Sequence, residues 1–218
     1  MKSSWETTRA KSNYHFDPSR ADRREDVIQN LGYFPPTAEW APALEQVIAA
    51  ARPATWATRG YKGEGIEAPP DELAAEEYDL ERAGYGKDYT ITHLSWAVPE
   101  VLQKYVDAFA LEDCMARLHI QKPGEVWNLH LDKLSKWKPD DPSRVIRIFI
   151  QLTDWQPGQF WEYGNYHWNQ WRAGDVTCFD WQNMPHSTAN AGHHPRVTLQ
   201  ITGVITEKTE NYLRSLKT

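Results

Sequence analysis

Short runs in which apolar and polar residues alternate dominate the second half of the chain. The clearest run covers 144–153, where Ile146, Ile148 and Ile150 alternate with more polar positions. Successive side chains of a strand point to opposite faces, so such alternation predicts strands with one apolar face. The strands expected on this basis are 117–121, 126–132, 144–153, 160–163, 166–171, 176–179 and 196–205, with Gly164-Asn165 as a two-residue hairpin turn.

Helical spacing of apolar residues is confined to the first half of the chain. It predicts one helix over 38–52 after a cap at Thr37, and a second over 100–110 after Pro99. The segment 53–88 is rich in Gly, Pro and acidic residues, and we interpret its part around 60–86 as a substrate lid. Helices followed by many short strands predict an α+β fold containing a β-sandwich or jelly roll.

The length of 218 residues fits one domain. We expect a mainly helical or irregular part over 1–114, a jelly-roll core over 115–206 and a C-terminal tail over 207–218. A chain of this size can bury a full hydrophobic core without disulfides or a structural metal. A metal ion bound by this protein is therefore not required to hold the fold together and can have a catalytic role.

The polar faces of the expected strands carry arginines and neutral hydrogen-bonding groups in place of the Lys and Glu mixture typical of solvent. The helices need an aliphatic sheet face to pack against, so we expect the polar faces to line a pocket inside the jelly roll. The alternative is an ordinary sandwich whose polar face meets water. The residues concerned include Arg117, His119, Gln121, Arg147, Arg196, Thr198 and Gln200.

Charge and composition narrow the range of partners. The net charge is −6, the sequence pI is about 5.8, and no dense Lys/Arg run is present, which disfavours nucleic acid as a partner. Cys114 and Cys178 suit the reduced thiols of a cytoplasmic protein. The sequence shows no signal-peptide core and no apolar stretch of about 18 residues, so we expect no membrane association and a cytoplasmic location.

Three residues form a candidate metal-binding set. His130 and Asp132 are two positions apart on an expected strand and so point to the same side, and His186 follows a later strand. Two imidazoles and one carboxylate are the ligands of non-haem iron(II) oxygenases, which leave positions open for a co-substrate and dioxygen. Ten residues beyond His186, Arg196 opens a strand and shares a face with Thr198. A guanidinium and a hydroxyl placed in this way can bind the distal carboxylate of 2-oxoglutarate.

These residues resemble the 2-oxoglutarate/Fe(II)-dependent oxygenase superfamily, whose pattern is His-x-Asp, a distal His, and an Arg about ten residues later. The resemblance covers roughly 115–205 and includes Lys122-Pro-Gly124, Ala173-Gly-Asp175 and Asn190-Ala-Gly192. The sequence around His186 is similar to the aspartyl/asparaginyl and prolyl hydroxylase branches. The first ~95 residues match no family that we can name.

The resemblance implies a cupin-like double-stranded β-helix that uses Fe(II), 2-oxoglutarate and O2. It implies hydroxylation of an unactivated C–H bond with release of succinate and CO2. The carboxylate ligand Asp132 argues against halogenation, because halogenases of the family lack it. We expect the substrate to be an amino acid, a peptide side chain or another small polar metabolite. The oligomeric state is left open.

Further residues are candidates for substrate binding, and two other functions are considered. The candidates are Arg147, His119, Gln121, Trp127, Asn128 and Trp168. The alternative for Arg147 is an ion pair with an acidic neighbour, and the alternative for His119 is a structural, hydrogen-bonded histidine. A zinc-dependent hydrolase could use the same three ligands, but the His-Glu-x-x-His motif is missing and Arg196 would have no task. A non-catalytic jelly roll could bind glycans through some of the 11 tryptophans, which would make the placement of the metal set a coincidence.

Overall fold

Two antiparallel sheets face one another in the computed structural model, which describes residues 28–55, 61–62, 66–67, 90–132, 134, 137–164, 166–182 and 184–216. The larger sheet has the strand order β1 (Ile28–Tyr33), β11 (Asp175–Phe179), β8 (Val145–Gln151), β13 (Arg196–Val204), β6 (Glu112–Gln121), β5 (Thr90–Ser95) and β2 (Arg52–Thr55). The smaller sheet has the order β10 (Tyr166–Trp168), β9 (Gln159–Tyr163), β12 (His186–Asn190) and β7 (Val126–His130). A separate short pair joins β3 (Tyr61–Lys62) to β4 (Ile66–Glu67).

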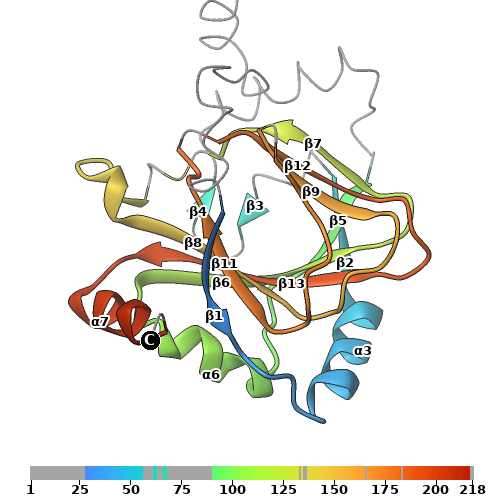
Figure 1. Ribbon diagram of the computed structural model, residues 1–218, viewed down its shortest axis with the longest axis horizontal. Coiled ribbons are helices and arrows are strands. Elements are labelled where there is room, and N and C mark those ends of the chain that lie inside the picture. Colours follow the sequence, from blue (N-terminus) through green and yellow to red (C-terminus); the bar gives the residue numbers. More distant parts are fainter. Residues whose placement is uncertain are drawn as a thin grey trace, which may run out of the picture.

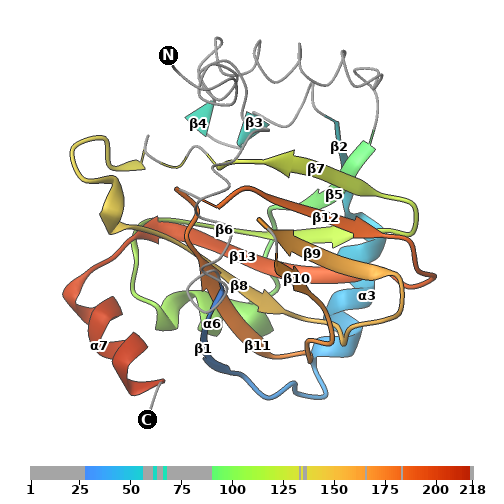
Figure 2. The same cartoon turned by 45° about the horizontal axis from the view of Figure 1, so that its top comes forward.

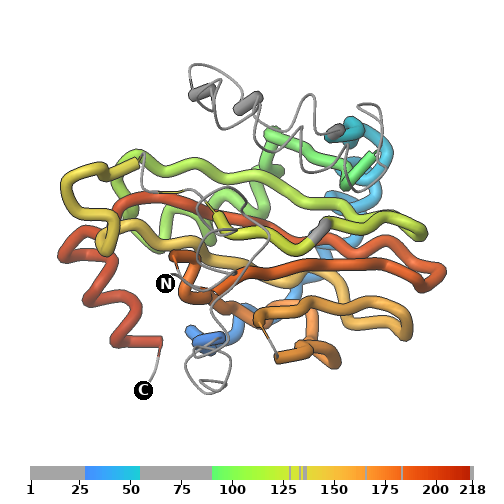
Figure 3. The backbone as a smooth tube through the Cα atoms, turned by 90° about the horizontal axis from the view of Figure 1, so that it is seen from above, coloured from blue at the N-terminus to red at the C-terminus, as the bar shows by residue number. Residues whose placement is uncertain are grey.

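From β6 onward the chain passes back and forth between the two sheets. β6, β8, β11 and β13 belong to the larger sheet, and β7, β9, β10 and β12 to the smaller one. Figure 1 and Figure 2 show β7, β12 and β9 facing the larger sheet across the interior. The strands of both sheets lie along roughly one axis of the molecule, and neighbouring strands run in opposite directions (Figure 3). This arrangement is a double-stranded β-helix, so the predicted α+β jelly roll is confirmed.

Two helices cover the outer face of the larger sheet, as its aliphatic pattern predicted. The helix α3 (Trp40–Ala50) buries Trp40, Leu44 and Val47, which recur at helical spacing. The helix α6 (Glu100–Ala108) buries Leu102 and Val106. These side chains form one hydrophobic cluster with the aliphatic faces of β6, β8 and β13. Figure 1 shows both helices on the side of the larger sheet that faces away from β7 and β12.

Several elements differ from the sequence-based expectation. The part before residue 115 contributes β1, β2 and β5 to the larger sheet, where only helices and irregular chain were expected. The strand β12 was also missed, because its residues are polar or small and yet mostly buried, which hides any alternation. Of the proposed lid at 60–86, only 61–62 and 66–67 lie within the described residues, so that interpretation stays a prediction.

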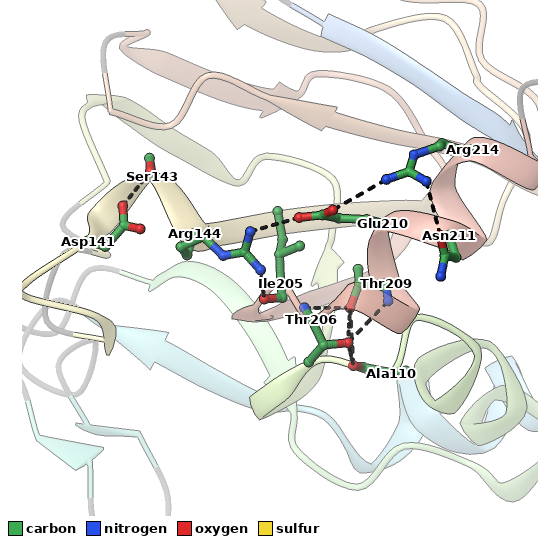
Figure 4. Close-up of polar contacts among 10 residues, drawn as sticks. All are labelled: Ala110, Asp141, Ser143, Arg144, Ile205, Thr206, Thr209, Glu210, Asn211 and Arg214. Carbon is green, nitrogen blue, oxygen red and sulfur yellow. Dashed lines mark hydrogen bonds and ion pairs between the residues drawn. The ribbon is translucent and has the colours of Figure 1, made fainter.

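The residues expected as a C-terminal tail instead form the helix α7 (Glu207–Ser215). Thr206 caps this helix in a capping box with Thr209, and its hydroxyl also donates to the carbonyl of Ala110 at 2.9 Å. Arg144 joins the helix to the start of β8 by an ion pair with Glu210 at 2.7 Å (Figure 4). Among the described helices, none has the length and apolar character needed to cross a membrane.

Candidate metal centre

His130, Asp132 and His186 come together at one end of the smaller sheet. His130 is the last residue of β7, His186 is the first of β12, and the two are paired across the antiparallel ladder. The Nε2 atom of His130 lies 3.9 Å from Oδ1 of Asp132, and Nε2 of His186 lies 3.8 Å from Oδ2 of the same carboxylate. One ligand atom from each residue lies within 4.8 Å of the other two, so the three can bind one metal ion.

Packing orients both imidazole rings. The ring of His130 stacks on Trp127 with centroids 5.5 Å apart and an interplanar angle of 14°. The ring of His186 meets Phe179 edge to face at 4.6 Å, and its Nδ1 lies 3.4 Å from the carbonyl oxygen of Met184. A ring nitrogen that faces a carbonyl carries the proton, which leaves Nε2 with a lone pair for a metal.

Asp132 forms a close ion pair with Arg147, a residue of β8 in the opposite sheet. The Arg147 guanidinium donates to Oδ2 of Asp132 at 2.5 Å, and the two side chains are only 9% and 10% exposed. Burial by itself raises the pKa of Asp132, but Arg147, His186 and His130 together hold that pKa well below its usual range. Asp132 is therefore a carboxylate at neutral pH, the form that a metal requires.

Arg147 also connects Asp132 to a buried hydrogen-bond network. Its Nε atom donates to the Thr202 hydroxyl at 3.1 Å. The Gln200 amide can be oriented in two ways, and only one of them satisfies its neighbours. In that orientation its oxygen accepts from Arg147 at 2.9 and 3.1 Å, and its nitrogen donates to Nε2 of His119 at 2.6 Å. Burial, and then the charges of Arg117, Arg147 and Arg196, lower the pKa of His119 well below its usual value. His119 is thus a neutral acceptor in this network.

A cavity of about 340 Å³, part of it open to solvent, lies between the sheets at these residues. The larger sheet contributes Arg117, His119, Arg147, Phe149, Arg196 and Gln200 to its walls. The smaller sheet and the chain that follows β7 contribute Trp127, His130, Asp132, Trp161, His186 and Thr188. The polar face of the larger sheet therefore lines an interior pocket, as the sequence predicted.

Arg196 reaches the cavity from the first position of β13 and is 3% exposed. Its guanidinium lies over the Trp161 ring at 4.6 Å and donates to the carbonyl of Phe160 at 3.3 Å. In the described part of the chain no carboxylate lies within ion-pair distance of it. Burial lowers the pKa of Arg196 to about 9, which Tyr163 opposes only in part. This buried cation lacks the anion that usually accompanies one.

Two more buried donors lie near Arg196 without an acceptor among the described residues. They are the indole nitrogen of Trp161, a cavity residue, and Nε2 of Gln151, which is opposite Thr198 on the neighbouring strand. Thr198 already donates its hydroxyl proton to Oε1 of Gln151 at 2.9 Å. Buried donors are normally paired, so this end of the site suits a ligand with several acceptor oxygens.

The structure places the remaining sequence-based candidates as follows. Trp127 and His119 stack on one another with ring centroids 5.1 Å apart and line the cavity. The side-chain nitrogen of Gln121 donates a hydrogen bond to the Thr188 hydroxyl at 2.9 Å, and the ring of Trp168 packs on that of Trp171. Gln121 and Trp168 do not line the cavity. The side chain of Asn128 lies outside the described residues.

Sequence reasoning did not assign Trp161 and Thr188, which line the cavity, or the adjacent buried Gln151 to this region. Trp161 and Thr188 directly oppose one another on β9 and β12, and Gln151 lies on β8 in the other sheet. The alternation of β8 placed Gln151 on the polar face, which was a usable signal. No comparable signal existed for Thr188, because β12 itself was not predicted.

Comparisons with known proteins support the fold. No family model matches the chain, and no curated protein matches it. The structure of the non-heme alpha ketoglutarate dependent epimerase SnoN from nogalamycin biosynthesis is similar, with a TM-score of 0.51 and 13% identity over 86% of this chain and 84% of that one. The chain has a jelly-roll fold of the cupin type.

Two further solved structures are more distant. A Pseudomonas putida prolyl-4-hydroxylase has a TM-score of 0.43 and 20% identity, over 77% of this chain and 99% of that one. A Cupin 2 conserved barrel domain protein from Salinispora arenicola has a TM-score of 0.34 and 12% identity, over 70% of this chain and 99% of that one.

Proposed function

We propose that this protein is an Fe(II)- and 2-oxoglutarate-dependent dioxygenase that hydroxylates an unactivated C–H bond. The observation that carries the proposal is the buried guanidinium of Arg196, which has no carboxylate partner among the described residues and faces the same cavity as His130, Asp132 and His186. A two-histidine, one-carboxylate set suits iron(II) with open coordination positions. A neighbouring buried cation suits the far carboxylate of a co-substrate that chelates that iron.

The residues present fit both groups. His130, Asp132 and His186 would hold the iron, and Arg196 would hold the distal carboxylate of 2-oxoglutarate. The indole nitrogen of Trp161, which has no acceptor among the described residues, would provide a hydrogen bond at the same end. Bound iron and 2-oxoglutarate supply the oxidising chemistry, in which O2 is consumed, 2-oxoglutarate yields succinate and CO2, and one oxygen atom enters the C–H bond.

The protein's own contribution is orientation and exclusion of water. Arg147 holds one oxygen of Asp132, and the flat ring of Trp127 fixes the plane of His130. Both histidine ligands are at most 5% exposed, so the metal would lie in a site with little solvent. Such a site protects a strong oxidant from side reactions with water.

The tryptophans give little support to the glycan-binding alternative. Of the nine tryptophans within the described ranges, four are buried and five are half-buried. A sugar-binding surface needs aromatic rings that face solvent, and Trp40, Trp161, Trp171 and Trp181 instead pack in the interior. The zinc-hydrolase alternative leaves the position of Arg196 at the cavity without a purpose.

The decisive experiment measures metal content and 2-oxoglutarate consumption together. Anaerobically loaded protein should bind one Fe(II) per chain, and should slowly release succinate from 2-oxoglutarate when O2 is admitted. His130→Ala, Asp132→Ala and His186→Ala should each abolish this release. Trp168→Ala, at an aromatic residue away from the cavity, is the control and should retain it. Succinate formation that persists in any of the three ligand variants would remove that residue from the metal site.

A further inference from the structure

A groove lies on the outer side of the larger sheet, between α6 and the first half of β6 (Figure 1). It has room for about 470 Å³, which is within the size range of ligand-binding sites. The walls of this outer groove include Trp96, Val98, Asp107, Leu111, Cys114 and Ala116. None of them lines the cavity at the metal centre, so the outer groove is a separate space.

β6 has an unpaired stretch of edge beside the outer groove. β13 pairs along nearly the whole of β6, whereas β5 pairs only with 118–120. The carbonyl of Ile120 faces β5, because it accepts from the Thr92 hydroxyl at 3.3 Å. Backbone groups two residues apart on an antiparallel strand face the same neighbour, so the N–H and C=O of Ala116 point to this side as well. No backbone group of the described residues is bonded to them there.

The outer groove has an apolar wall. Trp96, Val98 and Leu111 are half-buried, so part of each side chain stays accessible. The Arg117 guanidinium lies over the Trp96 ring, 5.2 Å from its centroid, and this contact fixes the orientation of the ring. A side chain of a ligand can therefore pack against a preformed apolar surface.

Negative charge borders this wall. Asp107 lines the groove, Glu112 and Asp113 follow Leu111, and all three acidic side chains are exposed. The Gln103 amide donates to Oδ1 of Asp107 at 2.9 Å and so orients the carboxylate. None of the described residues that line the groove is basic. Charge complementarity favours a basic partner and disfavours a second copy of this chain, whose own edge would bring the same acidic residues.

We propose that the outer groove binds an extended, basic peptide segment of a partner protein, which adds to the larger sheet beside β6. One residue of the segment exchanges two backbone hydrogen bonds with Ala116. An apolar side chain packs against Trp96 and Leu111, and a lysine or arginine meets Asp107. In such strand addition the backbone hydrogen bonds supply affinity and alternate side chains supply specificity. The interaction does not use the metal centre, so it is independent of the proposed function.

Three short peptides separate the contributions of charge and backbone pairing. The basic probe is acetyl-Lys-Thr-Leu-Thr-Lys-amide, the acidic probe has Glu in place of both Lys, and the third is the basic probe with an N-methylated leucine. Each is titrated into the full-length protein and followed by the chemical shifts of its backbone amides. The basic probe should bind at least about tenfold more tightly than the acidic one, since each exposed ion pair changes an affinity by up to about fivefold. N-methylation removes a backbone donor and should weaken binding by about fivefold.

Two variants and one further readout make the test specific to this groove. Asp107→Lys should abolish the preference for the basic probe. Asp140→Lys, at an exposed acidic residue outside the groove, is the matched control and should behave as wild type. The Ala116 amide hydrogen should exchange at least about tenfold more slowly when the basic probe is bound, because only strand pairing protects that group.

The inference is overturned if the basic and acidic probes bind equally or not at all, or if Asp107→Lys keeps the preference. It is also overturned if the N-methylated probe binds as tightly as its parent, because the peptide then does not pair with β6. A dimer in sedimentation in which the Ala116 amide is already protected without peptide would show that a second copy occupies the edge, and would likewise refute it.

Discussion

Replacing Arg147 with methionine tests whether the ion pair with Asp132 is as deeply desolvated as its geometry indicates. At an effective dielectric constant of about 20, charge centres about 4 Å apart attract one another by about 4 kcal/mol. The cost of removing both ions from water offsets most of this attraction, so the net contribution of the pair is small. Removal of only one partner leaves the other charge buried, which typically costs 3–5 kcal/mol. We therefore expect Arg147→Met to lower the free energy of unfolding by about 3 kcal/mol.

The assay is equilibrium unfolding in urea at pH 7 with a chelator present, followed by tryptophan fluorescence, with equal m-values as the condition for comparison. The double variant Arg147→Met/Asp132→Asn removes both charges and should regain about 2 kcal/mol of the loss. Arg214→Met breaks an exposed pair on α7 and should change stability by less than about 1 kcal/mol. The reasoning is refuted if Arg147→Met costs less than about 1 kcal/mol, or if the double variant is no more stable than the single one.

Three other outcomes are expected. Arg196→Lys keeps the charge but loses the two-pronged geometry, so 2-oxoglutarate affinity measured by calorimetry should fall roughly ten- to a hundred-fold with iron content unchanged; loss of iron with intact affinity would make Arg196 structural. The lowered pKa keeps His119 neutral in the folded protein. Below about pH 6.5 the unfolded chain therefore binds a proton that the folded protein does not bind. The stability of the fold should fall as the pH decreases through that value. Each pH unit there costs up to about 1.4 kcal/mol, and His119→Gln should lose that part of the acid sensitivity in urea titrations at pH 7 and pH 5.5. Gly158→Ala should destabilise the protein more than Gly124→Ala in the same titrations. Both glycines have φ near +90°, but only at Gly158 would a Cβ lie 2.5 Å from the backbone of Gly192. Equal losses of stability in the two variants would exclude this clash as the cause.

Local pattern was enough to predict much of this protein. Alternation along 144–153 and 196–205 identified β8 and β13, two strands of the larger sheet. It also separated the face of these strands that packs on the helices from the face that lines the cavity. The His-x-Asp spacing predicted that His130 and Asp132 share one side of a strand over 126–132. The two side chains do meet, although β7 ends at His130 and Asp132 lies in the chain that follows it. These predictions depend only on residues close together in the chain.

Tertiary structure decided the features that need distant residues to meet. β12 was not recognisable from its sequence, and only its pairing with β7 and β9 makes it a strand and places His186 opposite His130. The sequence left Arg147 open between a substrate or co-substrate contact and an ion pair with an acidic neighbour, and only the fold identifies Asp132 as that neighbour, from the opposite sheet. That Arg117, Arg147, Arg196 and Asp132 line one cavity likewise became visible only in the folded protein. Strand pairing and sheet packing join segments far apart in sequence, so no local periodicity encodes which side chains will face each other.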